Sequence, residues 1–366
     1  MNRLLRFWDD PRHMRDFRSA VCLHGHTMHS EECLSFLPSH LKRIPGLRHV
    51  IEKYQRNGAD FSKAYWTPPL TPEDAWGLEL PQISGLGLHA LISITDHDDI
   101  HAGIVLQKIA SRPQTPVSVE WTVPYRRTIL HIGLHHIPRQ YETSWMAAMK
   151  AYTQSPDERL VPELLSEFAK HPDVLIVLNH PFWLEEGVSR TDHEESLPVF
   201  LRECIRWIHA FEYNGTRPWP ENAAATHLAR RYAKPVVSGG DRHACEPAAC
   251  LNLSNALSFD EFVSEVRDGQ STVVIMPQYL EPMALRLFEA AWDILRPYPQ
   301  YPTRTKWTDR CFYRNEDGVA RPLSEVWEEH TPWILNPTTS LLRFAANSQF
   351  RPAIRFLLSA NAEALP

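Results

Sequence analysis

Short apolar segments rich in β-branched residues alternate with longer amphipathic segments along most of this 366-residue chain. Strands that alternate with helices favour a largely parallel sheet, and this many repeats favours closure of the sheet into an α/β barrel. The segments with a strand pattern are 19–26, 89–96, 115–122, 127–135, 173–180, 208–214, 235–241 and 271–276.

Helix-start signals support several of the intervening helices. Thr71-Pro72-Glu73-Asp74 offers a capping hydroxyl, a proline in the first turn and two acids at the positive end of the helix dipole. The segment 155–158 repeats this pattern, and the segment 258–261 does so without the proline. The predicted helices are 72–86, 99–110, 156–170, 197–207, 219–232 and 258–268.

Two regions fall outside the repeating unit. Residues 32–70 form a basic and aromatic insert after the first strand, either a solvated surface excursion or a lid over the carboxyl ends of the strands. Residues 278–366 form an extension of unknown role, mostly helical, whose tryptophans indicate that it is folded. We therefore expect a barrel over 1–277, with its insert at about 32–70, followed by the extension.

Composition and charge narrow the function classes. Hydrophobic residues make up 43%, as in folded globular proteins, and the longest apolar run, 174–178, is far too short for a membrane span. The N-terminus lacks the apolar core of a signal peptide, which predicts a cytoplasmic protein. A net charge of -6 argues against non-specific nucleic-acid binding. The six cysteines show no zinc-ribbon spacing, and we expect them to be reduced thiols.

Histidines and acids stand at the ends of the predicted strands. In a parallel barrel these ends converge on one face, and strand alternation points His24 and His26 to the same side. Each motif alone is more typical of surface histidines or turns, but burying the whole set without bound cations would be costly. Nitrogen and oxygen ligands without thiolate suit zinc, manganese or iron. The strand-end residues are His24, His26, Asp96, His97, Asp98, Asp99, Glu120, His131, His180, Asp241, Arg242 and His243.

The ordered series HxHTxxS, TDHD, a strand glutamate, a strand histidine, NHP and GxDxH resembles the PHP (polymerase and histidinol phosphatase) superfamily over roughly 18–277. The local segments LTPEDAW, GLGLHALISITDHD, FEYNG and FDEFVSEVRDGQSTVV agree with this resemblance. It implies a distorted (β/α)7 TIM-like barrel, the PHP fold, and a phosphoesterase that uses two or three divalent metal ions. The implied substrate is a small phosphorylated compound or a nucleotide; the oligomeric state stays open.

The resemblance also implies which residues bind metal. His24, His26 and Asp241 would bind the first ion, Glu120 would bridge the first and second, and His97 would bind the second. His131, His180 and His243 would bind the third, with His135 or His136 as alternatives to His131. Two positions depart from the family pattern. Cys22 replaces a usual aspartate, and Glu31 takes the place of a second-metal aspartate, with Glu32 and His29 as alternatives.

The catalytic roles follow as hypotheses. A hydroxide between the first and second metals would attack phosphorus. Glu120 would bridge these two metals, and Asp241 would help to hold the first one. Arg242 would either hold phosphoryl oxygens or form a salt bridge. Asp96 would orient a ligand, while Asp98 and Asp99 would mainly begin the next helix.

Two other functions compete with the phosphoesterase. A metal amidohydrolase also uses an HxH motif, but it needs a bridging carboxylated lysine where this chain offers Glu120. A catalytically silent barrel that serves as a binding or regulatory module would be expected to have lost metal ligands, and this set is nearly complete.

Overall fold

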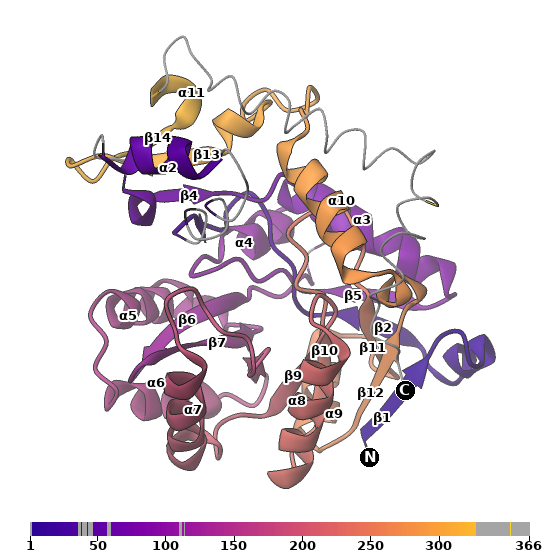
Figure 1. Ribbon diagram of the computed structural model, residues 1–366. Coiled ribbons are helices and arrows are strands. Elements are labelled where there is room, and N and C mark those ends of the chain that lie inside the picture. Colours follow the sequence, from indigo (N-terminus) through magenta and orange to yellow (C-terminus); the bar gives the residue numbers. More distant parts are fainter. Residues whose placement is uncertain are drawn as a thin grey trace.

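The strands of the computed structural model form two five-stranded sheets and one four-stranded sheet (Figure 1). The structure describes residues 2–35, 47–56, 60–109 and 114–326, together with positions 38, 42, 112 and 352. The remaining parts of the predicted insert and extension, among them Trp327 and Trp333, lie outside the described residues. No helix in the described part of the chain is both long and apolar enough to cross a membrane.

The first sheet contains the strand that leads to the HxH motif. Parallel pairs join β1 to β12 and β2 to β5, whereas β11 runs antiparallel to both of its neighbours. All four residues of β2 are buried, so the chain leaves this strand directly from the core. The strand order is β1 (Asn2–Arg6), β12 (Ser271–Ile275), β11 (Cys250–Ser254), β2 (Ser19–Cys22) and β5 (His89–Ile92).

The second sheet departs from the prediction of a largely parallel arrangement. Its strands β8, β9 and β10 are parallel, but β7 is antiparallel to both β6 and β8. The reason is a tight turn at Arg126 and Arg127, which joins β6 and β7 as a hairpin and leaves no crossover helix between them. The strand order is β10 (Val236–Gly239), β9 (Ala210–Asn214), β8 (Leu175–Asn179), β7 (Thr128–His135) and β6 (Val119–Tyr125).

Isolated parallel bridges connect the two five-stranded sheets. Ile94 pairs with Val117 and His97 with Glu120, which continues β5 onto β6. Gly25 pairs with Arg242, which links the ends of β2 and β10. Among the described strands the ladders do not close into a single sheet, so the seven-stranded barrel stays a prediction.

Helices pack around these sheets, and two of the predicted caps are present. The Thr71 hydroxyl accepts a hydrogen bond from the Asp74 amide at 3.1 Å, and the Ser258 hydroxyl accepts one from the Glu261 amide at 3.3 Å. Ser155 instead ends a helix that the sequence did not predict, α5. The helices are α3 (Pro72–Gly85), α4 (His101–Gln107), α5 (Glu142–Gln154), α6 (Leu160–Ala169), α7 (Arg190–Cys204), α8 (Trp219–Arg231) and α9 (Phe259–Arg267).

The insert and the extension meet in the third sheet, which we call the cap sheet. Its order is β14 (Ala320–Pro322), β13 (Cys311–Arg314), β4 (Ala64–Trp66) and β3 (Glu32–Cys33), antiparallel throughout. Figure 1 shows it near α2 and α11, at one end of the molecule. The prediction of a mostly helical extension therefore missed two strands.

The remaining helices complete the described chain, and the 3-10 helix η4 separates β12 from α10. They are α2 (Leu47–Arg56), α10 (Met283–Leu295), α11 (Leu323–Val326), and the 3-10 helices η1 (Pro11–Asp16), η2 (Phe61–Lys63), η3 (Arg139–Tyr141), η4 (Pro277–Leu280) and η5 (Trp307–Asp309).

Candidate metal centre

Two imidazoles approach each other directly after β2. The Nε2 atoms of His24 and His26 lie 3.0 Å apart, and both side chains are buried. Neutral imidazole nitrogens at this distance need either a proton between them or a shared cation. The HxH motif thus aims two imidazole nitrogens at one point, which is the arrangement that two ligands of one metal ion need.

Glu120 is the carboxylate around which the other groups gather. One of its oxygens, Oε2, lies 2.8 Å from His24 Nε2 and 3.5 Å from His97 Nε2. The other, Oε1, lies 3.1 Å from His180 Nε2 and 3.7 Å from His131 Nδ1. Burial alone would raise the pKa of Glu120, but the surrounding imidazoles outweigh burial and hold the pKa well below its ordinary value. Glu120 therefore offers an ionised oxygen to each side of the cluster.

Asp241, just beyond β10, closes the side of the cluster next to the HxH motif. Its Oδ1 lies 3.5 Å from His26 Nε2 and 3.8 Å from His24 Nε2. Its Oδ2 accepts hydrogen bonds from Thr216 at 2.9 Å and from Arg217 at 3.2 Å. Burial would raise the pKa of Asp241, yet the imidazoles and Arg217 keep it well below the ordinary value. One oxygen is thus anchored while the other faces the imidazoles.

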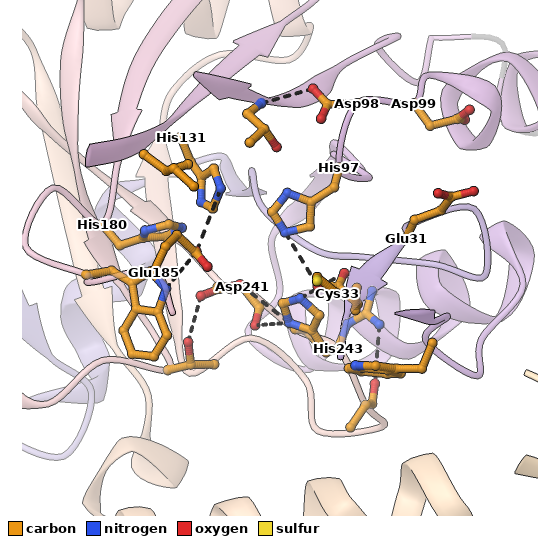
Figure 2. A pocket seen from close by; sticks show the side chains of 18 of the residues that line it. Glu31, Cys33, His97, Asp98, Asp99, His131, His180, Glu185, Asp241 and His243 are labelled. Atoms are coloured by element: carbon orange, nitrogen blue, oxygen red, sulfur yellow. Dashed lines mark hydrogen bonds and ion pairs between the residues drawn. The ribbon is translucent and has the colours of Figure 1, made fainter. Parts of the chain in front are cut away.

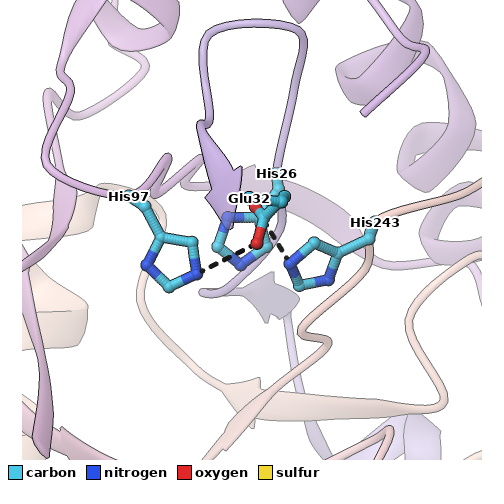
Figure 3. Close-up of side chains that lie close together, drawn as sticks. All are labelled: His26, Glu32, His97 and His243. Carbon is cyan, nitrogen blue, oxygen red and sulfur yellow. Dashed lines mark ion pairs between the residues drawn. The ribbon is translucent and has the colours of Figure 1, made fainter. Parts of the chain in front are cut away.

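Glu32, rather than Glu31, joins the cluster. Its Oε1 lies 3.2 Å from His243 Nε2 and its Oε2 lies 3.6 Å from His97 Nε2 (Figure 3). Glu31 is half-exposed and forms an ion pair with Arg314, away from the imidazoles (Figure 2). Neighbouring residues on a strand point to opposite faces, and Glu32 is the first residue of β3. The structure therefore places Glu32, which was an alternative to the predicted Glu31, beside the candidate ligand imidazoles, and it places Glu31 apart from them.

The possible ligand atoms fall into four overlapping sets. Within each set the atoms lie within 4.8 Å of one another, and all are nitrogen or carboxylate oxygen. The predicted grouping of His243 with His131 and His180 is not among them. The bridge between Gly25 and Arg242 draws His243 to the side of His26 instead. The sets are His24, His26 and Asp241; His24, Glu120 and His180; His97, Glu120 and His131; and His26, Glu32, His97 and His243.

The hairpin explains why His131, and not His135, reaches the centre. Because β7 is antiparallel to β8, His131 pairs with Asn179 at the end of β8 that leads to His180, whereas His135 pairs with Leu175. His135 lies against Ser93 instead, 3.1 Å away. Burial lowers the pKa of His135 to about 3, which keeps this imidazole neutral.

Arg242 lines the cavity, but its side-chain contacts favour the salt-bridge alternative over the predicted hold on phosphoryl oxygens. Its side chain is buried, and its Nε donates to Glu79 Oε1 at 3.0 Å. Its Nη1 lies close to the carbonyl oxygens of His26 and Ala244. These contacts match the salt-bridge alternative, because the guanidinium is already committed to protein groups.

The acids of the TDHDD segment position backbone rather than ligands. Asp96 accepts hydrogen bonds from the amide and the hydroxyl of Thr27, which anchors the chain just after His26. Burial, partly offset by these hydrogen bonds, raises the pKa of Asp96 to about 7. Asp98 accepts from the Thr122 amide at 3.0 Å, and Asp99 accepts from the His101 amide at the start of α4.

Glu212 in β9 is a site residue that the sequence did not identify. Its Oε1 lies 2.6 Å from His24 Nδ1, and its Oε2 accepts from the His180 amide at 2.8 Å. A carboxylate on the outer nitrogen of a ligand imidazole fixes the ring so that the other nitrogen faces the metal. A glutamate inside an otherwise apolar strand, in FEYNG, was the available signal.

A cavity of about 820 Å³ opens beside the cluster. Its walls include His97, His131, His180, Asp241 and His243 (Figure 2), and residues of the insert and the extension complete it. This volume suits a small molecule. The contributors from outside the two large sheets include Glu32, Trp66, Leu287, Ala290, Ile294 and Arg314.

No protein-family model and no curated protein matches the sequence. Three solved structures show partial similarity. PsfC from Pseudomonas syringae has 12% identity and a TM-score of 0.39, over 72% of this chain and 93% of that chain. A Bifidobacterium adolescentis protein described as a metal-dependent phosphoesterase has 14% identity and a TM-score of 0.34, over 56% and 92%. An amidohydrolase from Chromobacterium violaceum has 14% identity and a TM-score of 0.37, over 61% and 87%. At these scores, the activity of this chain has to be argued from its own residues.

Proposed function

We propose that the protein is a metal-dependent phosphoesterase with a centre of two or three divalent ions. The observation that carries the proposal is the buried carboxylate of Glu120, whose two oxygens lie among five imidazoles, those of His24, His26, His97, His131 and His180. Bound cations would accept the lone pairs of these imidazoles and neutralise the buried acids, which lowers the cost of burying both. When bound, the ions would activate water and polarise the phosphoryl group. Manganese, zinc or iron would suit this donor set.

The chain's own residues supply the holding and positioning. Glu120 and Asp241 provide the negative charge that retains cations, and His24, His26 and His97 direct nitrogen atoms at the same space. Glu212 holds the His24 ring, and Asp96 holds the segment after His26 through Thr27. The cavity beside the cluster would admit the ester.

Acids outnumber lysine and arginine in the cavity walls, and the arginines next to the cluster are the groups that would contact an anionic ester. Arg217 and Arg314 are among them. Glu120 would serve at the bridging position that an amidohydrolase gives to a carboxylated lysine. A silent binding module has no need for a complete set of aligned ligand atoms.

Elemental analysis of the purified protein, combined with a panel of phosphomonoesters, phosphodiesters and amides, tests this function. Wild type should retain divalent metal and hydrolyse phosphoesters, and Asp241→Asn should lose both properties while keeping its circular-dichroism spectrum. Turnover of amides alone would favour an amidohydrolase. Protein that stays metal-free and inactive after incubation with manganese, zinc or iron would favour a binding module.

A further inference from the structure

We propose that Arg217 binds the phosphoryl oxygens of the substrate at this centre, an inference that rests on the proposed phosphoesterase function. Arg217 lies between β9 and α8, three residues after Asn214. It lines the same cavity as His131, His180 and Asp241. An arginine at this place would present its planar fork to an anion beside the ligand atoms.

The guanidinium of Arg217 is held in place on two sides. Its carbon atom lies 3.6 Å from the centre of the Trp183 ring, and its Nη2 donates to Asp241 Oδ2 at 3.2 Å. Only 16% of the side chain is exposed. A group fixed in this way loses little conformational entropy when a ligand binds.

Arg217 nevertheless keeps unused hydrogen-bonding capacity. Its buried Nε has no hydrogen-bond partner, and its Nη1 makes no hydrogen bond to any residue that the structure describes. A buried donor without a partner is costly unless a ligand or a local shift satisfies it. The unpaired donor and the adjacent cavity point to a bound anion.

The other cations of the cavity are placed differently. Arg286 pairs with Glu246 and donates to the Gly215 carbonyl, and Arg314 pairs with Glu31. Lys150, on α5, is exposed. Arg217 combines a fixed guanidinium, a free donor and direct contact with a predicted metal ligand. A role limited to neutralising Asp241 would leave its Nη1 without a function.

Inorganic phosphate is the probe that tests this role without turnover. Calorimetry on the full-length, metal-loaded protein would compare wild type with Arg217→Ala and with Arg217→Gln, which keeps a planar donor near Asp241. Loss of hydrogen bonds to a charged group predicts phosphate affinity weaker by about 10- to 100-fold in Arg217→Ala. Metal content should stay at the wild-type level in both variants.

Lys150→Ala is the matched control, because it removes one positive charge from the same cavity. Its phosphate affinity should stay within about twofold of wild type, since an exposed cation contributes little. Equal losses in Lys150→Ala and Arg217→Ala would overturn the proposal in favour of a general electrostatic effect. Wild-type phosphate affinity in both Arg217 variants would also overturn it. Failure of the proposed function is a separate result: wild type would then hydrolyse no phosphoester, whatever the Arg217 variants bind.

Discussion

The two sides of the candidate site are built from different parts of the fold. On one side, Glu120, Asp241 and His24 are almost fully buried at the ends of strands in the two large sheets, and Glu212 contacts the outer nitrogen of the His24 ring. On the other side, Glu32 comes from the two-residue strand β3 of the cap sheet and is partly exposed. The strand-end side is therefore buried like a protein core, while the cap side is a small sheet at the surface.

The cap sheet depends on a long-range connection to hold Glu32. Glu32 pairs with Trp66 in β4, and Trp66 pairs with Cys311 in β13, so one row of the sheet links the ligand to the extension. The Thr67 amide continues this link to the Arg310 carbonyl at 2.9 Å. The candidate ligand Glu32 therefore depends on the extension for its position, whereas the other candidate ligands depend on the two large sheets. Damage to the strand-end side should therefore have larger effects than damage to the cap.

Glu120→Gln should have the largest effect. An amide cannot supply two negatively charged oxygens, so the five imidazoles around it would lose their shared counter-charge. We expect loss of most bound metal and a fall in kcat/KM of about 10³-fold or more. Elemental analysis and steady-state kinetics would measure both. Near-normal metal content in a folded Glu120→Gln protein would contradict the central position of this residue.

Glu212→Gln tests the brace behind the strand-end side. The amide would hold the His24 ring less firmly and would lower its basicity, so metal affinity should fall by about 10- to 100-fold. A competition titration with a chelator would measure the affinity. Glu203→Gln is the matched control, because Glu203 accepts a hydrogen bond from the Tyr125 hydroxyl and belongs to none of the ligand sets. Equal losses in both variants would indicate general destabilisation rather than a brace.

Local sequence patterns identified most residues of the strand-end side, although not Glu212. His24 and His26 alternate along one extended segment. His97 follows a predicted strand, and His180 and Asp241 are the last residues of two others. Each of these signals lies within a few neighbouring residues, because a candidate ligand stands at the carboxyl end of its own strand or just beyond it. Most of the candidate ligands could therefore be chosen before any pairing between strands was known.

Pairing between distant segments could not be predicted in the same way. The cap sheet joins β4 to β13, which are more than two hundred residues apart, and nothing in either segment specifies the other. Glu31 immediately precedes the two-residue strand β3, and Glu32 begins it, so the two acids differ by one position along the chain. The turn at Arg126 and Arg127 lacks the glycine or asparagine typical of hairpins, which hid the antiparallel β6–β7 pair.

Glu32→Gln compared with Glu31→Gln tests the cap side directly. Because His26, His97 and His243 would remain, we expect a partial loss: lower metal content and a fall in kcat/KM of about tenfold. Glu31→Gln removes only an exposed ion pair with Arg314 and should stay close to wild type. The reverse order of effects would restore Glu31 as the ligand.

Arg304→Ala should have the smallest effect, because it loosens the cap without removing a ligand. The Arg304 Nη1 donates to the Met28 carbonyl at 2.6 Å, and the guanidinium lies 5.4 Å from the centre of the Phe312 ring. It therefore ties the segment after His26 to β13. Losing one such bond to a charged donor should destabilise the cap by about 1.5–3 kcal/mol locally. Hydrogen exchange should quicken in β3 and β4, while kcat/KM falls only about two- to threefold, because the strand-end ligands are unaffected.

Arg321→Ala is the control for Arg304→Ala, since Arg321 forms only an exposed ion pair with Asp317 within the same part of the extension. It should leave both exchange and turnover unchanged. If Arg304→Ala instead abolished metal binding as completely as Glu120→Gln, the cap would be as essential to the centre as the strand ends. The two sides would then have to fold as one cooperative unit, because a surface attachment that can loosen independently cannot transmit a loss of that size.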